Sequence, residues 1–142
     1  MKDPDKILDA FKTRSDQAAR VVGELRDARD RTLKHQVQVL QQIETAYQDT
    51  RKDRMAAQAA AGYAKRCLQQ AAALRREAEK IAEAEVLALH QLERTFGDQK
   101  RFEVYLSQRQ LKEKAVARKR EENALLEQID QLQAAKARKE AE

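Results

Sequence analysis

Residues that break helices are nearly absent from this chain. Its 142 residues include a single proline, Pro4, and only three glycines, and these two residue types cost a helix the most free energy. Ala, Leu, Gln, Glu, Lys and Arg, which are strong helix formers, occupy most of the remaining positions. We therefore expect long helices rather than a compact globule.

The composition also limits the size of any core. Hydrophobic residues make up 42% of the chain and charged residues 37%, while aromatic residues reach only 4%. Much of the apolar fraction is alanine, and this composition is typical of coiled coils and long helices. Apolar residues recur at helical spacing nearly throughout, which argues against disorder. We predict one all-α unit over residues 1–142.

The charge pattern does not favour a nucleic-acid partner. There are 29 basic and 24 acidic residues, a net charge of +5, and they are interleaved. The densest basic run, residues 112–120, contains Glu113 and is followed at once by Glu121 and Glu122. Electrostatic nucleic-acid binders usually gather their cations in one patch. We expect no nucleic-acid partner, although a basic helical nucleic-acid binder remains an alternative.

The single cysteine and the hydropathy pattern bear on location. Cys67 is alone, so the chain can form no internal disulfide, which fits a reducing compartment. It falls on an apolar helix face, where we expect an inert core thiol. No segment has the roughly 20 apolar residues of a membrane-spanning helix, and the first residues do not resemble a signal peptide. We expect a cytoplasmic protein.

A first helix is predicted over about residues 4–54. Asp3 is a suitable N-cap and Pro4 suits the first helical position. A step of eight separates Leu25 from Leu33, with Arg29 where a heptad would have an apolar residue, so we expect local unwinding there. The apolar residues that recur mainly every three or four positions are Leu8, Phe11, Ala18, Val22, Leu25, Leu33, Val37, Leu40, Ile43 and Tyr47.

A second helix is predicted over about residues 63–138, after a turn within 52–63 in which Gly62 would be the C′ residue. A turn at Gly97-Asp98 is the alternative, but it would leave half of the first helix without a partner. The expected fold is an antiparallel coiled-coil hairpin whose second helix overhangs beyond about Val116. The apolar rhythm of the second helix continues into the overhang, where we expect Leu125, Ile129 and Leu132 to be exposed and to await a binding partner. The residues of that rhythm before the overhang are Cys67, Ala71, Leu74, Ala78, Ile81, Leu89, Leu92, Phe96, Phe102 and Leu106.

No catalytic or metal motif is present in the sequence. It has no glycine-rich phosphate loop and no recognisable nucleophile motif. His35 and His90 would lie far apart along the hairpin, and Glu83 and Glu85 fall on different helix faces. We predict a protein that is not an enzyme, with no catalytic residue, metal or cofactor, whose function lies in its surfaces.

Several segments resemble the FliJ family, the stalk proteins of the flagellar type III export apparatus. The most telling segment is Ala18-Ala19-Arg20-Val21-Val22-Gly23-Glu24-Leu25-Arg26, which is similar to the first helix of that family. Lys100-Arg101-Phe102 and the run from Leu125 to Asp130 look like its second helix and tail. The YscO-like stalks of virulence secretion systems share this architecture and stay open as an alternative, as does a generic structural coiled coil.

The resemblance implies a hairpin similar to the gamma-subunit stalk of rotary ATP synthases. Its terminal end would enter the pore of a hexameric export ATPase and promote assembly and hydrolysis. Its mid-section would contact the cytoplasmic ring of the export gate and escort export chaperones, so that any membrane association is peripheral. The implied ATPase-binding residues are Arg14, Arg20, Arg118, Lys119, Arg120 and Leu125. The implied gate- or chaperone-binding residues are Val37, Leu40, Ile43, Tyr47, Leu68 and Leu74, which could equally hold the two helices together.

Overall fold

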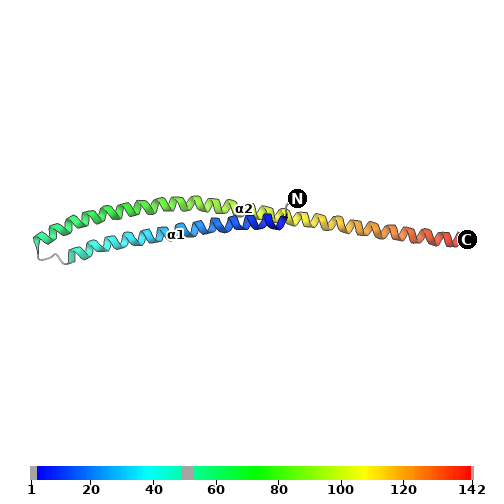
Figure 1. Ribbon diagram of the computed structural model, residues 1–142, viewed down its shortest axis with the longest axis horizontal. Coiled ribbons are helices and arrows are strands. Elements are labelled where there is room, and N and C mark those ends of the chain that lie inside the picture. Colours follow the sequence, from blue (N-terminus) through cyan, green and yellow to red (C-terminus); the bar gives the residue numbers. More distant parts are fainter. Residues whose placement is uncertain (1–2, 49–52, 142) are drawn as a thin grey trace.

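Two long helices make up the described part of the protein. The computed structural model describes residues 3–48 and 53–141. Helix α1 spans Pro4–Gln48 and helix α2 spans Arg54–Ala141. The two helices run antiparallel and side by side, and α2 continues far beyond the N-terminal end of α1 (Figure 1). The predicted all-α helical hairpin is confirmed.

Each helix begins at an aspartate cap. The Oδ1 atom of Asp3 accepts a hydrogen bond from the backbone N–H of Asp5 at 3.0 Å, and Pro4 is the first residue of α1. At the start of α2, Oδ1 of Asp53 accepts from the N–H of Met55, also at 3.0 Å. These bonds satisfy N–H groups that have no partner within the helix. The predicted cap at Asp3 is confirmed, and Asp53 is a second one.

The predicted helix limits are wrong near the turn. Helix α2 begins at Arg54 rather than near residue 63, and Asp53, which the predicted first helix included, lies outside both helices. Gly62 is therefore an interior residue of α2 and not a C′ residue. The alanine-rich stretch before Gly62 has high helix propensity, so the helix starts as soon as Asp53 can cap it. Residues 49–52, which hold part of the last turn of the predicted first helix and the first residue of the predicted turn, lie outside the described residues. Gly97 is inside α2, so the alternative turn is not used.

An uninterrupted seam joins the helices. The seam residues are all buried or half-buried and alternate in steps of three and four along each helix. Such a heptad repeat is the pattern of a coiled coil with left-handed supercoiling. On α1 they are Leu8, Phe11, Ser15, Ala18, Val22, Leu25, Arg29, Thr32, Gln36, Val39, Ile43 and Ala46. On α2 they are Ala57, Ala60, Ala64, Cys67, Ala71, Leu74, Ala78, Ile81, Glu85, Ala88, Leu92, Thr95, Gln99, Phe102, Leu106 and Arg109.

The expected unwinding after Val22 does not occur. Polar residues continue the heptad at Arg29, Thr32 and Gln36, so no eight-residue step is needed. The apolar residues that we assigned to the seam in this region follow the true seam positions by one residue, which turns them about 100° away. Leu33, Val37, Leu40 and Tyr47 are 40–52% exposed. Phe96 on α2 is displaced in the same way and is 49% exposed.

The tightest packing lies toward the turn. Val39, Cys67 and Ala71 form a buried cluster, and half-buried Ile43 and Leu74 pack against it, together with Tyr63. Alanine supplies most of the buried positions of α2 in this half of the hairpin, and small side chains let two helices approach closely. Burial of Cys67, 3% exposed, agrees with a thiol that serves packing.

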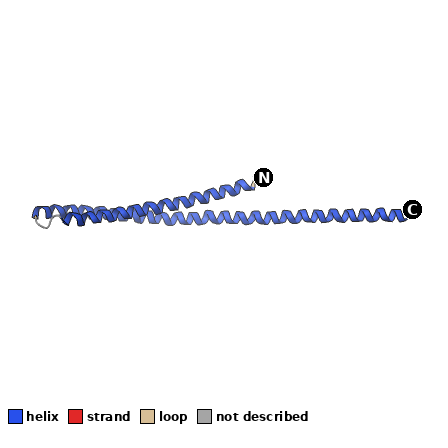
Figure 2. Ribbon diagram, turned by 90° about the horizontal axis from the view of Figure 1, so that it is seen from below, coloured by secondary structure: helices blue, strands red, loops and turns tan. Residues whose placement is uncertain are grey.

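Aromatic residues close the other end of the paired region. The rings of Phe11 and Phe102 lie 5.3 Å apart, and Tyr105 lies 6.0 Å beyond Phe102. From Gln110 to Ala141 every described residue is exposed. This segment, called the overhang below, continues α2 as an unpaired helix (Figures 1 and 2). It begins earlier than the expected position near Val116, because α1 starts opposite Leu106 and Gln110.

Candidate partner-binding surfaces

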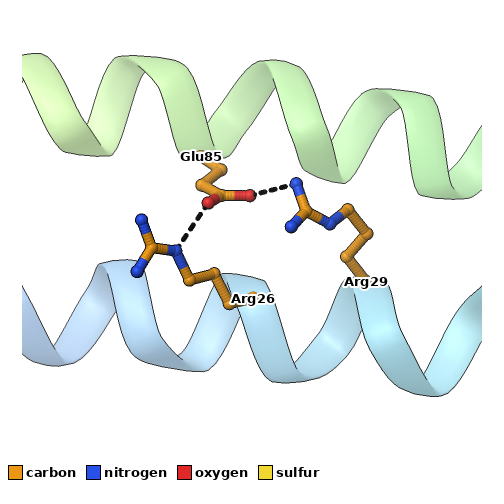
Figure 3. Close-up of polar contacts among 3 residues, drawn as sticks. All are labelled: Arg26, Arg29 and Glu85. Atoms are coloured by element: carbon orange, nitrogen blue, oxygen red, sulfur yellow. Dashed lines mark hydrogen bonds and ion pairs between the residues drawn. The ribbon is translucent and has the colours of Figure 1, made fainter.

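A buried polar layer lies in the middle of the seam. The carboxylate of Glu85 accepts a hydrogen bond from Nε of Arg26 at 2.8 Å and from Nη1 of Arg29 at 2.6 Å (Figure 3). The Glu85 side chain is 8% exposed, whereas those of Arg29 and Arg26 are 35% and 55% exposed. The carboxylate is therefore enclosed, and both guanidinium groups retain access to water.

This layer sets the alignment of the two helices. A one-heptad slip would bury Glu85 without a cation, and an unpaired buried charge is costly. Polar residues at seam positions are known to fix register in coiled coils in this way. Glu83 is exposed whereas Glu85 is buried, so the two carboxylates lie on different helix faces as predicted. The pairing of Glu85 could not be predicted from local spacing, because the arginines lie 56 and 59 positions away in the sequence.

The overhang carries four of the six residues assigned to ATPase binding. Arg118, Lys119, Arg120 and Leu125 are all exposed on it. Residues 110–141 contain eight basic and six acidic residues, so the surface is mixed in charge. At 1.5 Å per residue the segment extends about 48 Å beyond the paired region. It is a thin rod with no enclosing wall.

Arg14 and Arg20 lie elsewhere on the hairpin. Both are exposed on α1, and the guanidinium of Arg14 sits 5.9 Å from the centre of the Phe11 ring. The register set by Phe11 and Phe102 places them about 29 Å and 38 Å along the axis from Arg118. The structure therefore does not bring these two arginines together with the basic residues of the overhang.

The residues assigned to the gate or to chaperones divide into two groups. Ile43 and Leu74 pack against the buried cluster, so they hold the helices together. The other four lie outside the seam. Leu40 comes one residue after the seam residue Val39, and Leu68 comes one residue after the seam residue Cys67. Residues at the same heptad position of two antiparallel helices lie on the same face of the hairpin, so Leu40 and Leu68 share a face. We call this surface the apolar face, and it consists of Leu33, Val37, Leu40, Tyr47 and Leu68, all of them 40–56% exposed.

Two ionisable side chains near these surfaces have shifted pKa values. A hydrogen bond with Cys67 and, to a smaller degree, burial raise the pKa of Tyr63 above 10.0, and its hydroxyl donates to Oε1 of Gln42 at 3.2 Å. At the open end, hydrogen bonds from Gln99 and Lys100 lower the pKa of Glu103 below its ordinary value. The raised pKa favours the neutral phenol of Tyr63, which bonds to Gln42 on α1. The lowered pKa favours the charged carboxylate of Glu103, which accepts hydrogen bonds from Gln99 and Lys100.

The described residues offer no metal centre and no membrane span. Among residues 3–48 and 53–141 no three His, Cys, Asp or Glu side chains are grouped as metal ligands would be. His35 and His90 are both exposed. Neither α1 nor α2, within these ranges, contains a stretch apolar enough to cross a bilayer.

Comparison with known proteins does not identify a relative. No family model, no curated protein and no solved structure matches the chain.

Proposed function

We propose that this protein is the stalk of a type III protein export ATPase, of the flagellar kind. The observation that carries the proposal is the overhang: a closed hairpin extended by a bare helix of mixed charge. A rod of this shape can enter the central pore of a ring without a matching pocket. The resemblance of residues 18–26 and 100–130 to the FliJ family points to the same function. The protein itself performs no catalysis in this proposal.

The overhang is the part that enters the ATPase hexamer. Its exposed Arg118, Lys119, Arg120 and Leu125 contact the pore, where many weak polar contacts favour ring assembly without locking the subunits. Arg14 and Arg20 lie too far along the hairpin to share that contact. They therefore meet the mouth of the ring only if the overhang is fully inserted.

The apolar face serves the remaining contacts. Exposed apolar patches on a thin coiled coil mark surfaces for other proteins, and this one lies toward the turn, away from the overhang. We assign it to the cytoplasmic ring of the export gate or to export chaperones. Membrane association is then peripheral and passes through the gate.

The direct test is ATP hydrolysis by the purified cognate export ATPase, titrated with this protein while the size of the complex is followed. The proposal predicts faster hydrolysis together with hexamer formation. Replacing Arg118, Lys119 and Arg120 by alanine should weaken stimulation without loss of helicity. A matched control replaces Lys136, Arg138 and Lys139, the other basic cluster of the overhang, and should retain more stimulation.

The outcomes separate the alternatives. If neither the rate of ATP hydrolysis nor the size of the ATPase complex changed, the generic structural coiled coil would be the remaining alternative. Stimulation of a virulence-system ATPase in preference to a flagellar one would indicate a YscO-like stalk. Full stimulation by the triple-alanine variant would remove the assignment to residues 118–120 and leave the stalk itself standing.

A further inference from the structure

The overhang has an apolar stripe of its own. Along it, Leu111, Ala115, Leu125, Ile129 and Leu132 recur with the three-four spacing of a coiled-coil seam, and the four large residues among them are 49–70% exposed. The stripe is two positions out of phase with the seam that faces α1. It therefore lies on the opposite side of α2, where α1 does not cover it.

Two charged residues complete this second heptad. Arg118 and Glu122 occupy the two stripe positions between Ala115 and Leu125. Both are exposed, and neither has an ion-pair partner assigned among the described residues. A partner helix on the stripe would have to neutralise an arginine and a glutamate one turn apart.

We propose that the partner is the overhang of a second copy, packed antiparallel so that the two-fold axis passes between the helices at the level of residue 120. In this register Arg118 of one copy faces Glu122 of the other, and the two-fold symmetry repeats this ion pair, so that the dimer contains it twice. Ala115 faces Leu125 and Leu111 faces Ile129, so a small residue meets a large one and two large residues meet. The stripe is thus complementary to itself in both charge and size.

A parallel dimer does not have this property. In parallel register each residue faces its own copy, so that Arg118 would oppose Arg118 and Glu122 would oppose Glu122. Like charges placed against each other at an interface are costly and act against that arrangement. The order of charges along the stripe therefore selects the antiparallel arrangement, in which the overlap from Gln108 to Leu132 is about 36 Å long.

Dimerisation would cover two of the residues assigned to the ATPase. Arg118 and Leu125 belong to the stripe, so a chain paired with its copy could not insert the same surface into a ring. The dimer is then a storage form that the ATPase must displace. The dimer itself rests on the structure alone and is measured without any ATPase, so its failure and that of the stalk proposal are distinguishable.

Charge reversal tests the register. In sedimentation equilibrium of the full chain, the wild type should show a monomer–dimer equilibrium. Arg118→Glu and Glu122→Arg alone should each weaken dimerisation by about 100-fold, because each opposes like charges twice. The double variant, and an equal mixture of the two single variants, should restore it. Arg120→Glu is the matched control: it makes the same charge change on the outer face of the dimer and should leave dimerisation within a fewfold of wild type.

Cross-linking tests the direction of the helices. With Cys67→Ala as background, oxidation of a mixture of Leu111→Cys and Ile129→Cys chains should give the mixed cross-link, and neither variant should cross-link with itself. A monomer at every concentration, dimers unaffected by the single reversals, or Leu111→Cys cross-linked with itself would each overturn the proposal.

Discussion

In the polar layer around Glu85, removing the two arginines should cost far more stability than removing the glutamate. The carboxylate is enclosed, whereas Arg26 and Arg29 reach water. Removing both arginines leaves a buried charge with no partner, and this is the expensive way to break an ion pair. Removing Glu85 instead leaves two arginines whose guanidinium groups can reach solvent while the methylene parts of their side chains stay packed on the hairpin. The two perturbations should therefore differ greatly, although they break the same hydrogen bonds.

The magnitudes follow from exposure. Arg29→Ala should lower the free energy of unfolding by about 2 kcal/mol, less than for a fully enclosed pair, because Arg29 is partly solvated. Arg26→Ala should cost about 1 kcal/mol, since solvent screens its more exposed guanidinium. The double variant should lose about 3–5 kcal/mol. Glu85→Leu should stay within about 1 kcal/mol of wild type, because leucine suits a seam position.

Urea unfolding followed by far-UV circular dichroism would measure these differences, with the slope of the transition as a check that the same surface unfolds. Arg75→Ala is the matched control. Its pair with Glu79 lies on the surface at 3.4 Å, so the loss should stay below about 0.5 kcal/mol. If Glu85→Leu proved more damaging than the double arginine variant, the reasoning from burial would be refuted.

Three further predictions follow from single positions. The Ser15 hydroxyl is buried and has no hydrogen-bond partner among the described residues, so Ser15→Ala should raise the free energy of unfolding by up to about 1 kcal/mol and the urea midpoint with it; a lower midpoint would show that the hydroxyl is satisfied. Gly62→Ala should stabilise α2 by about 1 kcal/mol, since a Cβ there meets no atom within 4 Å, and an unchanged or lower melting temperature would contradict a helical Gly62. Because hydrogen bonds from Gln99 and Lys100 lower the Glu103 pKa in the folded state, its contribution is fully present above its ordinary value of 4.5 and is lost as pH falls through the lower folded value; Glu103→Gln should flatten that acid dependence, and an identical pH profile would count against these bonds.

Local sequence signals were enough for the hairpin. The scarcity of proline and glycine predicted two long helices, and the Asp3-Pro4 pair predicted the start of α1. Asp53 carries the same signal and precedes an alanine-rich run, so the start of α2 was also readable. The start of α2 was nevertheless predicted about nine residues too late, because Gly62 was interpreted as the C′ residue of a turn. An isolated glycine in a long helix-forming segment costs only about 1 kcal/mol, which is too little to end the helix.

The seam of α1 could not be found from hydrophobicity alone. Between Leu25 and Val39 its inward positions are Arg29, Thr32 and Gln36, and apolar residues directly follow the last two of these. Arg29 is acceptable in a seam only because Glu85 meets it there, and that pairing depends on the register of the whole hairpin. Four residues of the apolar face, Leu33, Val37, Leu40 and Tyr47, were consequently assigned to the seam. Of these, all except Leu33 were also named as candidate contacts. The overhang, by contrast, followed directly from the unequal helix lengths.

Hydrogen–deuterium exchange, with and without the cognate export ATPase, tests the central claim most directly. It should be carried out at a dilution where the protein is monomeric. In the free protein, amides of the paired region should exchange slowly and those of residues 110–141 quickly, because no tertiary contact protects the overhang. The account predicts that the ATPase slows exchange chiefly within residues 110–141. Unchanged exchange in the overhang, or protection confined to the apolar face, would contradict it.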